Sequence, residues 1–305
     1  MSIDPAVSLA GLLVGFTVGL TGMGGGALMT PVLILFFNIN PLAAVSSDIV
    51  ASVIMKPIGG SVHLRHGTVH TGIVKYLVIG SIPSAFIGVL LLQLLGDGAE
   101  LESRLRTLLG ATLLVAATAM TIKTLIQANR PEQSVPVDQI LVRAMPTIAV
   151  GVLGGLVVGL TSVGSGSLII VLLLLLYPRL QSSTLVGTDL VQAVPLVASA
   201  AIGHLLFGDF QLALTTSLLL GCVPGVYAGA RLSSRAPSHA LRPVLVAVLV
   251  ASALKLLGAT TALAAGTGLG LGLLTTAITL RALRSARARA EAEGVPVNAE
   301  IVSER

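Results

Sequence analysis

The sequence predicts an all-α polytopic membrane protein with about 8 to 11 transmembrane segments, arranged as two homologous repeats. Three observations predict this fold class: 54% of the 305 residues are hydrophobic, only 10% are charged, and the apolar residues gather in long runs. The mean hydropathy of +0.97 lies outside the range of ordinary water-soluble domains. The runs lack the period-two alternation of a transmembrane barrel. We therefore expect helices, which satisfy their own backbone hydrogen bonds in lipid.

Apolar runs mark the expected helices in chain order. The first half holds the runs 6–20, 27–37, 42–62, 72–95 and 105–126, and the second half holds 140–160, 168–177, 185–206, 212–232 and 241–257. A further run, 259–280, has no counterpart in the first half. The start of the chain lacks a basic segment and a small-residue cleavage site, so run 6–20 is expected to be the first retained span.

The two halves are a duplicated unit. An offset of 140 aligns Gly15, Gly19, Leu20, Thr21, Gly24, Gly26 and Leu28 with Gly155, Gly159, Leu160, Thr161, Gly164, Gly166 and Leu168. An offset of 141 then aligns Asp48, His63, Gly67, Gly80, Pro83 and Gly88 with Asp189, His204, Gly208, Gly221, Pro224 and Gly229. We therefore divide the chain into a first repeat (1–128), a polar linker (129–139), a second repeat (140–258), an extra C-terminal helix (259–281) and a tail (282–305).

A glycine loop interrupts the first helix of each repeat. A single helix over 6–37 would be about 48 Å long, against a hydrocarbon core of about 30 Å. The loop "GLTGMGGGAL" at 19–28 therefore breaks it, and "GLTSVGSGSL" at 159–168 breaks 140–177 in the same way. The break forms either two short helices or a re-entrant hairpin.

The placement of charges favours inverted repeats over parallel ones. If the pieces on each side of a loop cross separately, each half has an odd number of crossings and the halves are inverted. That arrangement gathers on one side Arg65, Lys75, Lys123, Arg130, Arg143, Arg179, Arg231, Arg235 and the tail residues Arg281, Arg284, Arg287 and Arg289. Asp97, Glu100 and Glu102 lie opposite, and Arg104 and Arg106 are the exceptions. By the positive-inside rule we expect a cytoplasmic tail and no nucleic-acid partner.

The loops predict an anion site. Irregular backbone at membrane depth must be buried in protein or line a wet cavity. Each loop leads into a helix N-terminus, whose free N–H groups and positive dipole end attract anions, and glycine lets an oxyanion approach closely. The candidate binding residues are Thr21, Gly22, Gly24, Gly25 and Gly26 in the first loop and Thr161, Ser162, Gly164, Ser165, Gly166 and Ser167 in the second. The alternative is that these glycines only allow close helix packing.

Polar residues inside the spans are candidates for the same site. Lys56 is either a counter-charge for the anion or a partner of Asp48, two helical turns earlier. Gln192 either donates to an oxyanion or bridges helices. The candidates for proton coupling are Asp48, Asp189, His63 and His204, with helix capping as the alternative for the aspartates and an interfacial structural role for the histidines.

The duplicated loops, the segments "SSDIVAS" and "GTDLVQA", and the turns "HLRHGTV" and "HLLFGDF" resemble the sulfite exporter TauE/SafE family. The resemblance covers nearly the whole chain. It implies a multi-pass plasma-membrane transporter that exports sulfite, sulfoacetate, thiosulfate or similar sulfur oxyanions and organosulfonates, by a proton-linked or potential-driven mechanism without ATP. The expected partners are a small anion, protons and the lipid bilayer. The second loop carries three serines where the first has Gly22, Gly25 and Ala27, so the half-sites should differ.

Two other functions are kept open. An intramembrane serine hydrolase would use Ser165 as nucleophile and His204 as base, but Gly25 replaces Ser165 in the first repeat. A cation transporter would use Asp and His as ligands, whereas the loops present donors. We therefore expect no enzyme activity, no cofactor and no metal site, and we interpret the single cysteine, Cys222, as a packing residue.

Overall fold

The computed structural model describes residues 3–21, 25–96, 98–128, 140–233 and 238–292, and helices dominate this part of the chain. Each predicted run forms a helix. The first repeat contains α1 (Pro5–Thr21), α2 (Gly26–Phe36), α3 (Pro41–Arg65), α4 (Thr71–Leu92), the short 3-10 helix η1 (Gln93–Leu95) and α5 (Gly98–Ala128). The second contains α6 (Ala144–Thr161), α7 (Leu168–Leu176), α8 (Ser182–Phe207), α9 (Leu212–Ser233) and α10 (Ser238–Leu256), and α11 (Thr261–Ala292) follows.

The helices confirm an all-α polytopic membrane protein. Seven of the described helical segments are long and apolar enough to cross a membrane, within α3, α4 with η1, α5, α6, α8, α9 and α11. Helices α2 and α7 have 11 and 9 residues. At 1.5 Å per residue each spans about half of a 30 Å hydrocarbon core. Each glycine loop therefore separates a longer helix from a half-helix.

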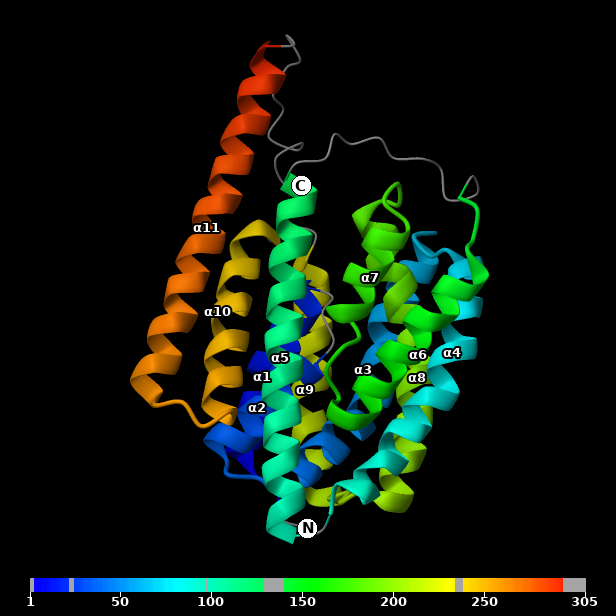
Figure 1. Cartoon of the computed structure of the whole chain (residues 1–305), viewed down its shortest axis with the longest axis vertical. Coiled ribbons are helices and arrows are strands. Elements are labelled where there is room, and N and C mark those ends of the chain that lie inside the picture. Colours follow the sequence, from blue (N-terminus) through cyan, green and yellow to red (C-terminus); the bar gives the residue numbers. More distant parts are fainter. Residues whose placement is uncertain (1–2, 22–24, 97, 129–139, 234–237, 293–305) are drawn as a thin grey trace.

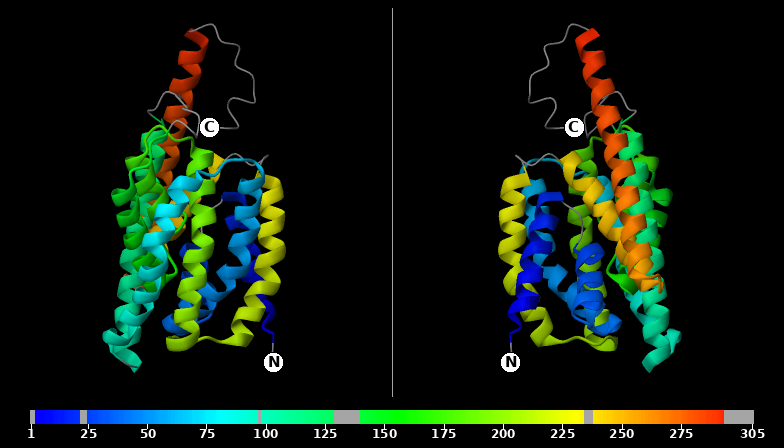
Figure 2. Two further views of the ribbon diagram at one scale, coloured as in Figure 1. Left: turned by 90° about the vertical axis from the view of Figure 1, so that its right-hand side faces the viewer. Right: turned by 90° about the vertical axis from the view of Figure 1, so that its left-hand side faces the viewer.

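The repeats have inverted topology. Figures 1 and 2 show that α5 rises from the end of the molecule where the chain begins, whereas its counterpart α10 descends toward that end. The counterparts α3 and α8 are opposed in the same way. The packing follows this symmetry: α1 packs on α9 as α6 packs on α4, while α3 meets α8 and α5 meets α10 across the centre.

Glycines inside α1 and α6 allow this close packing. A Cβ at Gly15 of α1 would lie 2.8 Å from the Cα of Cys222 in α9. A Cβ at Gly155 of α6 would lie 2.6 Å from the Ser81 carbonyl in α4. The interpretation of glycine as a packing residue therefore holds for these helical positions, where small side chains let backbones approach. Cys222 is fully buried in this interface, as expected for a packing residue.

Helix α11 lacks a counterpart in the first repeat. It packs mainly on α10 and extends well beyond the bundle, as Figure 1 shows. The helix continues to Ala292, past the apolar run that was predicted to end at 280. The Ala- and Arg-rich sequence of this extension favours helix in water as well, which explains the longer element.

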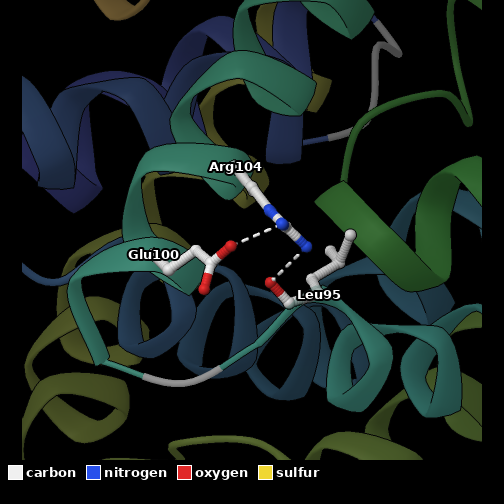
Figure 3. Close-up of polar contacts among 3 residues, drawn as sticks. All are labelled: Leu95, Glu100 and Arg104. Atoms are coloured by element: carbon white, nitrogen blue, oxygen red, sulfur yellow. Dashed lines mark hydrogen bonds and ion pairs between the residues drawn. The ribbon is translucent and has the colours of Figure 1, made fainter.

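Charges at the two ends follow the predicted sides. The end of α3 with Arg65, the start of α6 after Arg143 and the end of α9 with Arg231 lie at the end toward which α11 points. At the opposite end Arg104, an exception in the charge pattern, is paired: it donates to Glu100 Oε1 at 2.5 Å and to the Leu95 carbonyl at 3.0 Å (Figure 3).

Candidate functional site

The two broken helices meet in the middle of the bundle. Gly26, the first residue of α2, lies against Ser162 in the second loop so closely that an added Cβ would overlap the Ser162 carbonyl. In Figure 1 the chain between α6 and α7 runs at about mid-height of the bundle. Two chain breaks 140 residues apart in sequence therefore lie side by side near the centre of the bundle, the place where inverted repeats with discontinuous helices commonly bind a substrate.

The second loop depends on glycine for its conformation. Ser162 has φ 60°, Gly164 has φ 136° and Gly166 has φ 88°. Positive φ is strained for residues with a Cβ and open to glycine, so the spacing of Gly164 and Gly166 reflects the backbone path. Gly164 and Gly166 thus have a different role from the helical glycines, whereas Gly26 allows the close approach of α2 to Ser162.

Asp48 lies in the interior of α3 and is 1% exposed. Its Oδ2 accepts hydrogen bonds from the Ser162 hydroxyl at 2.7 Å and from the Thr30 hydroxyl of α2 at 3.1 Å. The N-cap of α3 is Asn40, whose side chain accepts from the Leu42 N–H, so the capping interpretation of Asp48 is wrong. Asp48 instead joins the half-helix of the first repeat to the loop of the second.

Asp189 occupies the matching position in α8 and is also 1% exposed. Its Oδ2 accepts the backbone N–H of Gly166 at 2.6 Å, and its Oδ1 accepts from Gln192 Nε2 at 2.9 Å. The N-cap of α8 is Gln181, so Asp189 does not cap the helix either. The Gln192 carbonyl oxygen accepts from the Ser81 hydroxyl at 3.4 Å, so Gln192 bridges α8 to α4 while it holds the carboxylate.

Lys56 reaches from α3 into the second loop. Its ammonium donates to the Ser165 hydroxyl, and the residue is 7% exposed. It interacts electrostatically with Asp48 and Asp189. Within the described residues, however, no carboxylate oxygen lies within 4.0 Å of its nitrogen. An ammonium carries three donors, so this buried cation has capacity for another acceptor.

Ser167 is the N-cap residue of α7, but its side chain makes no capping hydrogen bond. Its hydroxyl is buried and is one of two buried side-chain polar atoms without a partner in the described part of the chain; the other is Thr215 Oγ1. Buried hydroxyls are normally satisfied, so an unpartnered one at a helix N-terminus is a donor available to an anionic ligand.

The remaining loop candidates divide into three groups. The hydroxyls of Thr21 and Thr161 donate to the carbonyls of Thr17 and Val157, at 2.8 and 2.7 Å. Gly25, the N-cap residue of α2, borders Asp48 and Met55 with room for a methyl group. Gly22 and Gly24 lie outside the described residues.

The two histidines differ in burial and partners. His204 is fully buried: Nε2 donates to the Gly159 carbonyl at 2.9 Å, and Nδ1 lies 2.9 Å from the Ser46 hydroxyl of the other repeat. His63 is half-buried, with Nδ1 2.9 Å from the Thr68 hydroxyl. Among the hydrogen bonds of the described residues, neither histidine pairs with Ser165, so the Ser165–His204 pair of the alternative hydrolase is not formed.

Sequence reasoning missed three residues of the site: Thr30, Ser81 and Lys123. Lys123 of α5 is half-buried and interacts electrostatically with Asp189. A lysine inside the apolar run 105–126 was an available signal for it, although we grouped it with the basic residues of one membrane side. Thr30 and Ser81 carried no such signal, because hydroxyls are common within apolar helices.

Comparisons with known proteins agree with this architecture. The family described as Sulfite exporter TauE/SafE matches residues 7–256. The "Probable membrane transporter protein YjnA" of Bacillus subtilis (strain 168) is 39% identical over 256 residues, which cover 83% of this chain and 99% of that protein. The "Probable membrane transporter protein YdhB" of the same organism is 25% identical over 239 residues, 77% and 93% of the two chains. No solved structure matches.

Proposed function

The chain belongs to the sulfite exporter TauE/SafE family of membrane transporters, and from this premise we propose that it exports small sulfur-containing oxyanions or organosulfonates. Sulfite, sulfoacetate and thiosulfate are the candidate substrates. Transport is secondary, driven by a proton gradient or the membrane potential, and no cofactor takes part. The substrate binds at the central site, where the start of α7 faces Lys56.

The observation that carries this proposal is the incompletely coordinated cation. Lys56 is buried, donates to the neutral Ser165 hydroxyl and has no carboxylate within 4.0 Å among the described residues. Burying an ammonium without a close counter-charge is costly. An anion that accepts from Lys56 and from the unpartnered Ser167 hydroxyl would satisfy both groups.

The other residues are assigned roles around that anion. Ser165 orients the Lys56 ammonium, Gly166 and the first turn of α7 supply backbone donors, and Gly25 and Gly26 form the adjoining wall. Asp48 and Asp189 are the candidates for coupling a proton to transport, since both carboxyl groups interact electrostatically with Lys56. The buried contacts of His204 favour a structural role for that residue over proton transfer.

The membrane and orientation are also proposals. We place the protein in the plasma membrane with the C-terminal tail in the cytoplasm. The support is the basic residues at the end toward which α11 points, namely Arg65, Arg143 and Arg231, because positive residues are enriched on the cytoplasmic side.

Transport by purified protein in proteoliposomes tests the function. Uptake of sulfite, thiosulfate, sulfoacetate and chloride is measured with and without an imposed pH gradient. We expect saturable, gradient-sensitive movement of one sulfur oxyanion, and little movement of chloride. Failure of all four anions to move, with protein that is folded by size-exclusion chromatography, would contradict the proposal.

A matched lysine pair tests the site. Lys56→Gln should reduce transport at least about tenfold, because the buried charge facing the anion is lost. Lys75→Gln is the control, because Lys75 is exposed near the start of α4. Its Nζ lies 5.9 Å from the centre of the Tyr76 ring. Equal transport by the two variants would remove Lys56 from the anion path.

The contact between Lys56 and Ser165 also favours a second candidate function. A lysine beside a serine hydroxyl can act as its base, so this pair could replace Ser165–His204 in an intramembrane hydrolase. Incubation with a fluorophosphonate probe distinguishes the two functions. Covalent labelling of wild type that is lost in Ser165→Ala would support the hydrolase, and absence of labelling in a transport-competent protein would exclude it.

A further inference from the structure

The Gly166 amide, which should help to bind the anion, already has a charged partner. Asp189 Oδ2 accepts the Gly166 N–H at 2.6 Å, directly before α7. The adjacent Ser167 is 6% exposed, and its buried hydroxyl has no hydrogen-bond partner among the described residues. The Ser167 hydroxyl is thus an unused donor next to the Gly166 amide, which the Asp189 carboxylate occupies. This arrangement indicates an anion site that a side chain of the protein partly fills.

We propose that the Asp189 carboxylate is a tethered occupant of the anion site at the start of α7, and that the transported oxyanion displaces it from the Gly166 amide. This inference rests on the proposed function, because it requires an anionic substrate at that site. It assigns Asp189 the role of an internal competitor that sets the affinity for the substrate.

The chemistry of the two competitors is matched. A carboxylate and a sulfur oxyanion both accept charge-assisted hydrogen bonds, and one backbone N–H donates to one strong acceptor at a time. Gln192, on the same helix, holds Asp189 Oδ1 at 2.9 Å and keeps the carboxylate at the amide. The apparent Kd for the anion therefore equals the intrinsic Kd divided by the fraction of molecules in which the Gly166 amide is free of Asp189.

Displacement changes the charge balance of the site. The charged groups that face Asp189 are Lys56 from α3 and Lys123 from α5, while α4 contributes the Ser81 hydroxyl through Gln192. With Asp48, the cluster holds two lysines and two aspartates, which are formally neutral together. A monovalent anion such as hydrogensulfite adds one negative charge, and uptake of a proton by the released Asp189 would restore neutrality. Thiosulfate and sulfoacetate carry two negative charges at neutral pH, so one proton would compensate half of the added charge. Displacement thus links substrate binding to a proton.

Asp48 provides a control with the same charge in the same cluster. Its recorded donors are the hydroxyls of Thr30 and Ser162, and neither is a backbone amide at the start of α7. Removing the charge of Asp48 therefore lowers electrostatic repulsion toward an anion without freeing the Gly166 N–H. The two aspartates separate displacement from a general effect of charge.

Equilibrium binding of radiolabelled sulfite, thiosulfate and sulfoacetate to purified full-length protein tests the inference. For the anion that wild type binds, we expect Asp189→Asn to lower Kd by about tenfold, and Asp48→Asn by less than about threefold. If wild type binds none of the anions, the proposed function fails. If wild type binds one and the two variants have equal effects, or Asp189→Asn binds no tighter than wild type, the displacement is wrong and the proposed function stands.

Infrared difference spectroscopy of wild type and Asp48→Asn keeps the inference testable if Asp189→Asn does not fold. Saturation with the anion should change the carboxylate stretching bands in both proteins, because Asp189 loses its bond to the Gly166 amide. No change in wild type, or a change that disappears in Asp48→Asn, would overturn the inference.

Discussion

The two repeats contribute different chemistry to one site. The first supplies Asp48 and Lys56, and the second supplies the hydroxyls that meet them, Ser162 and Ser165. In the alignment of the two repeats, Lys56 corresponds to Val197. Ser162 and Ser165 correspond to Gly22 and Gly25. The duplicated unit has thus diverged at these positions: only the first repeat carries a lysine and only the second carries the two loop serines, while each repeat keeps its aspartate, Asp48 or Asp189. The site exists because inversion brings the two halves together at the centre.

The histidines repeat this contrast. His204 bonds across the repeat interface to Ser46, whereas His63 bonds to Thr68, five residues away in its own repeat. Ser46 corresponds to Gly187 in the second repeat, so the hydroxyl that would give His63 the equivalent contact is missing. Sequence symmetry therefore does not guarantee equal roles.

The largest expected effects on transport and stability come from substituting the loop glycines, and these effects should differ from one glycine to the next. Gly166→Ala should reduce transport at least about tenfold, since its φ of 88° costs a residue with a Cβ about 1 to 3 kcal/mol. Gly26→Ala should also impair folding, because its Cβ would overlap the Ser162 carbonyl. A Cβ at Gly25 would lie 3.6 Å from Met55 Cε and 3.9 Å from Asp48 Oδ1, so Gly25→Ala should retain near wild-type stability.

The stability of each glycine variant is measured in detergent as the temperature at which its monodisperse size-exclusion peak is lost. Transport by the same variants is then measured in proteoliposomes. Similar thermal stability of Gly25→Ala and Gly26→Ala would contradict the contact between α2 and the second loop.

The histidine pair should show the next largest effect. His204→Ala should destabilise the fold by about 2 to 4 kcal/mol, because it leaves a buried cavity and removes two hydrogen bonds. His63→Ala should cost less than about 1 kcal/mol, since that side chain is half-buried. Denaturant titration in mixed micelles gives both values, and equal costs would refute the distinction between the two histidines.

The two unpartnered hydroxyls give a smaller and more specific effect. Ser167→Ala should leave stability unchanged, because the hydroxyl has no protein partner, and should weaken anion binding about threefold to tenfold. Thr215→Val removes the other such hydroxyl, in α9, and should leave anion affinity unchanged. Binding isotherms at one temperature compare the affinities of the two variants for the anion. An equal loss of affinity in both would show that the Ser167 hydroxyl does not bind the anion.

The smallest effect is expected at the surface. Arg104 and Glu100 form a pair with side chains 49% and 62% exposed (Figure 3). Exposed ion pairs contribute little, so Arg104→Gln should change stability by less than about 1 kcal/mol and leave transport intact. A loss of transport comparable to that of Lys56→Gln would place the start of α5 in the substrate path.

The sequence by itself predicted the membrane class, the duplication, the helical runs and the two breaks. These follow from local physics: an apolar run too long for one span must break, and positive φ selects glycine at Gly164 and Gly166. It also identified Asp48, Lys56 and Asp189 as unusual, because charge inside an apolar helix is costly wherever the helix lies.

Only the tertiary structure decided which polar groups meet. Lys56 and Ser165 are 109 residues apart, and Asp48 and Ser162 are 114 apart, so neither periodicity nor spacing could pair them. The same holds for the capping interpretation of the aspartates, which depended on helix starts that Asn40 and Gln181 define. Hydrogen bonds act over about 3 Å. The partner of a buried side chain is therefore set by how the inverted repeats pack, and the local sequence carries no record of that.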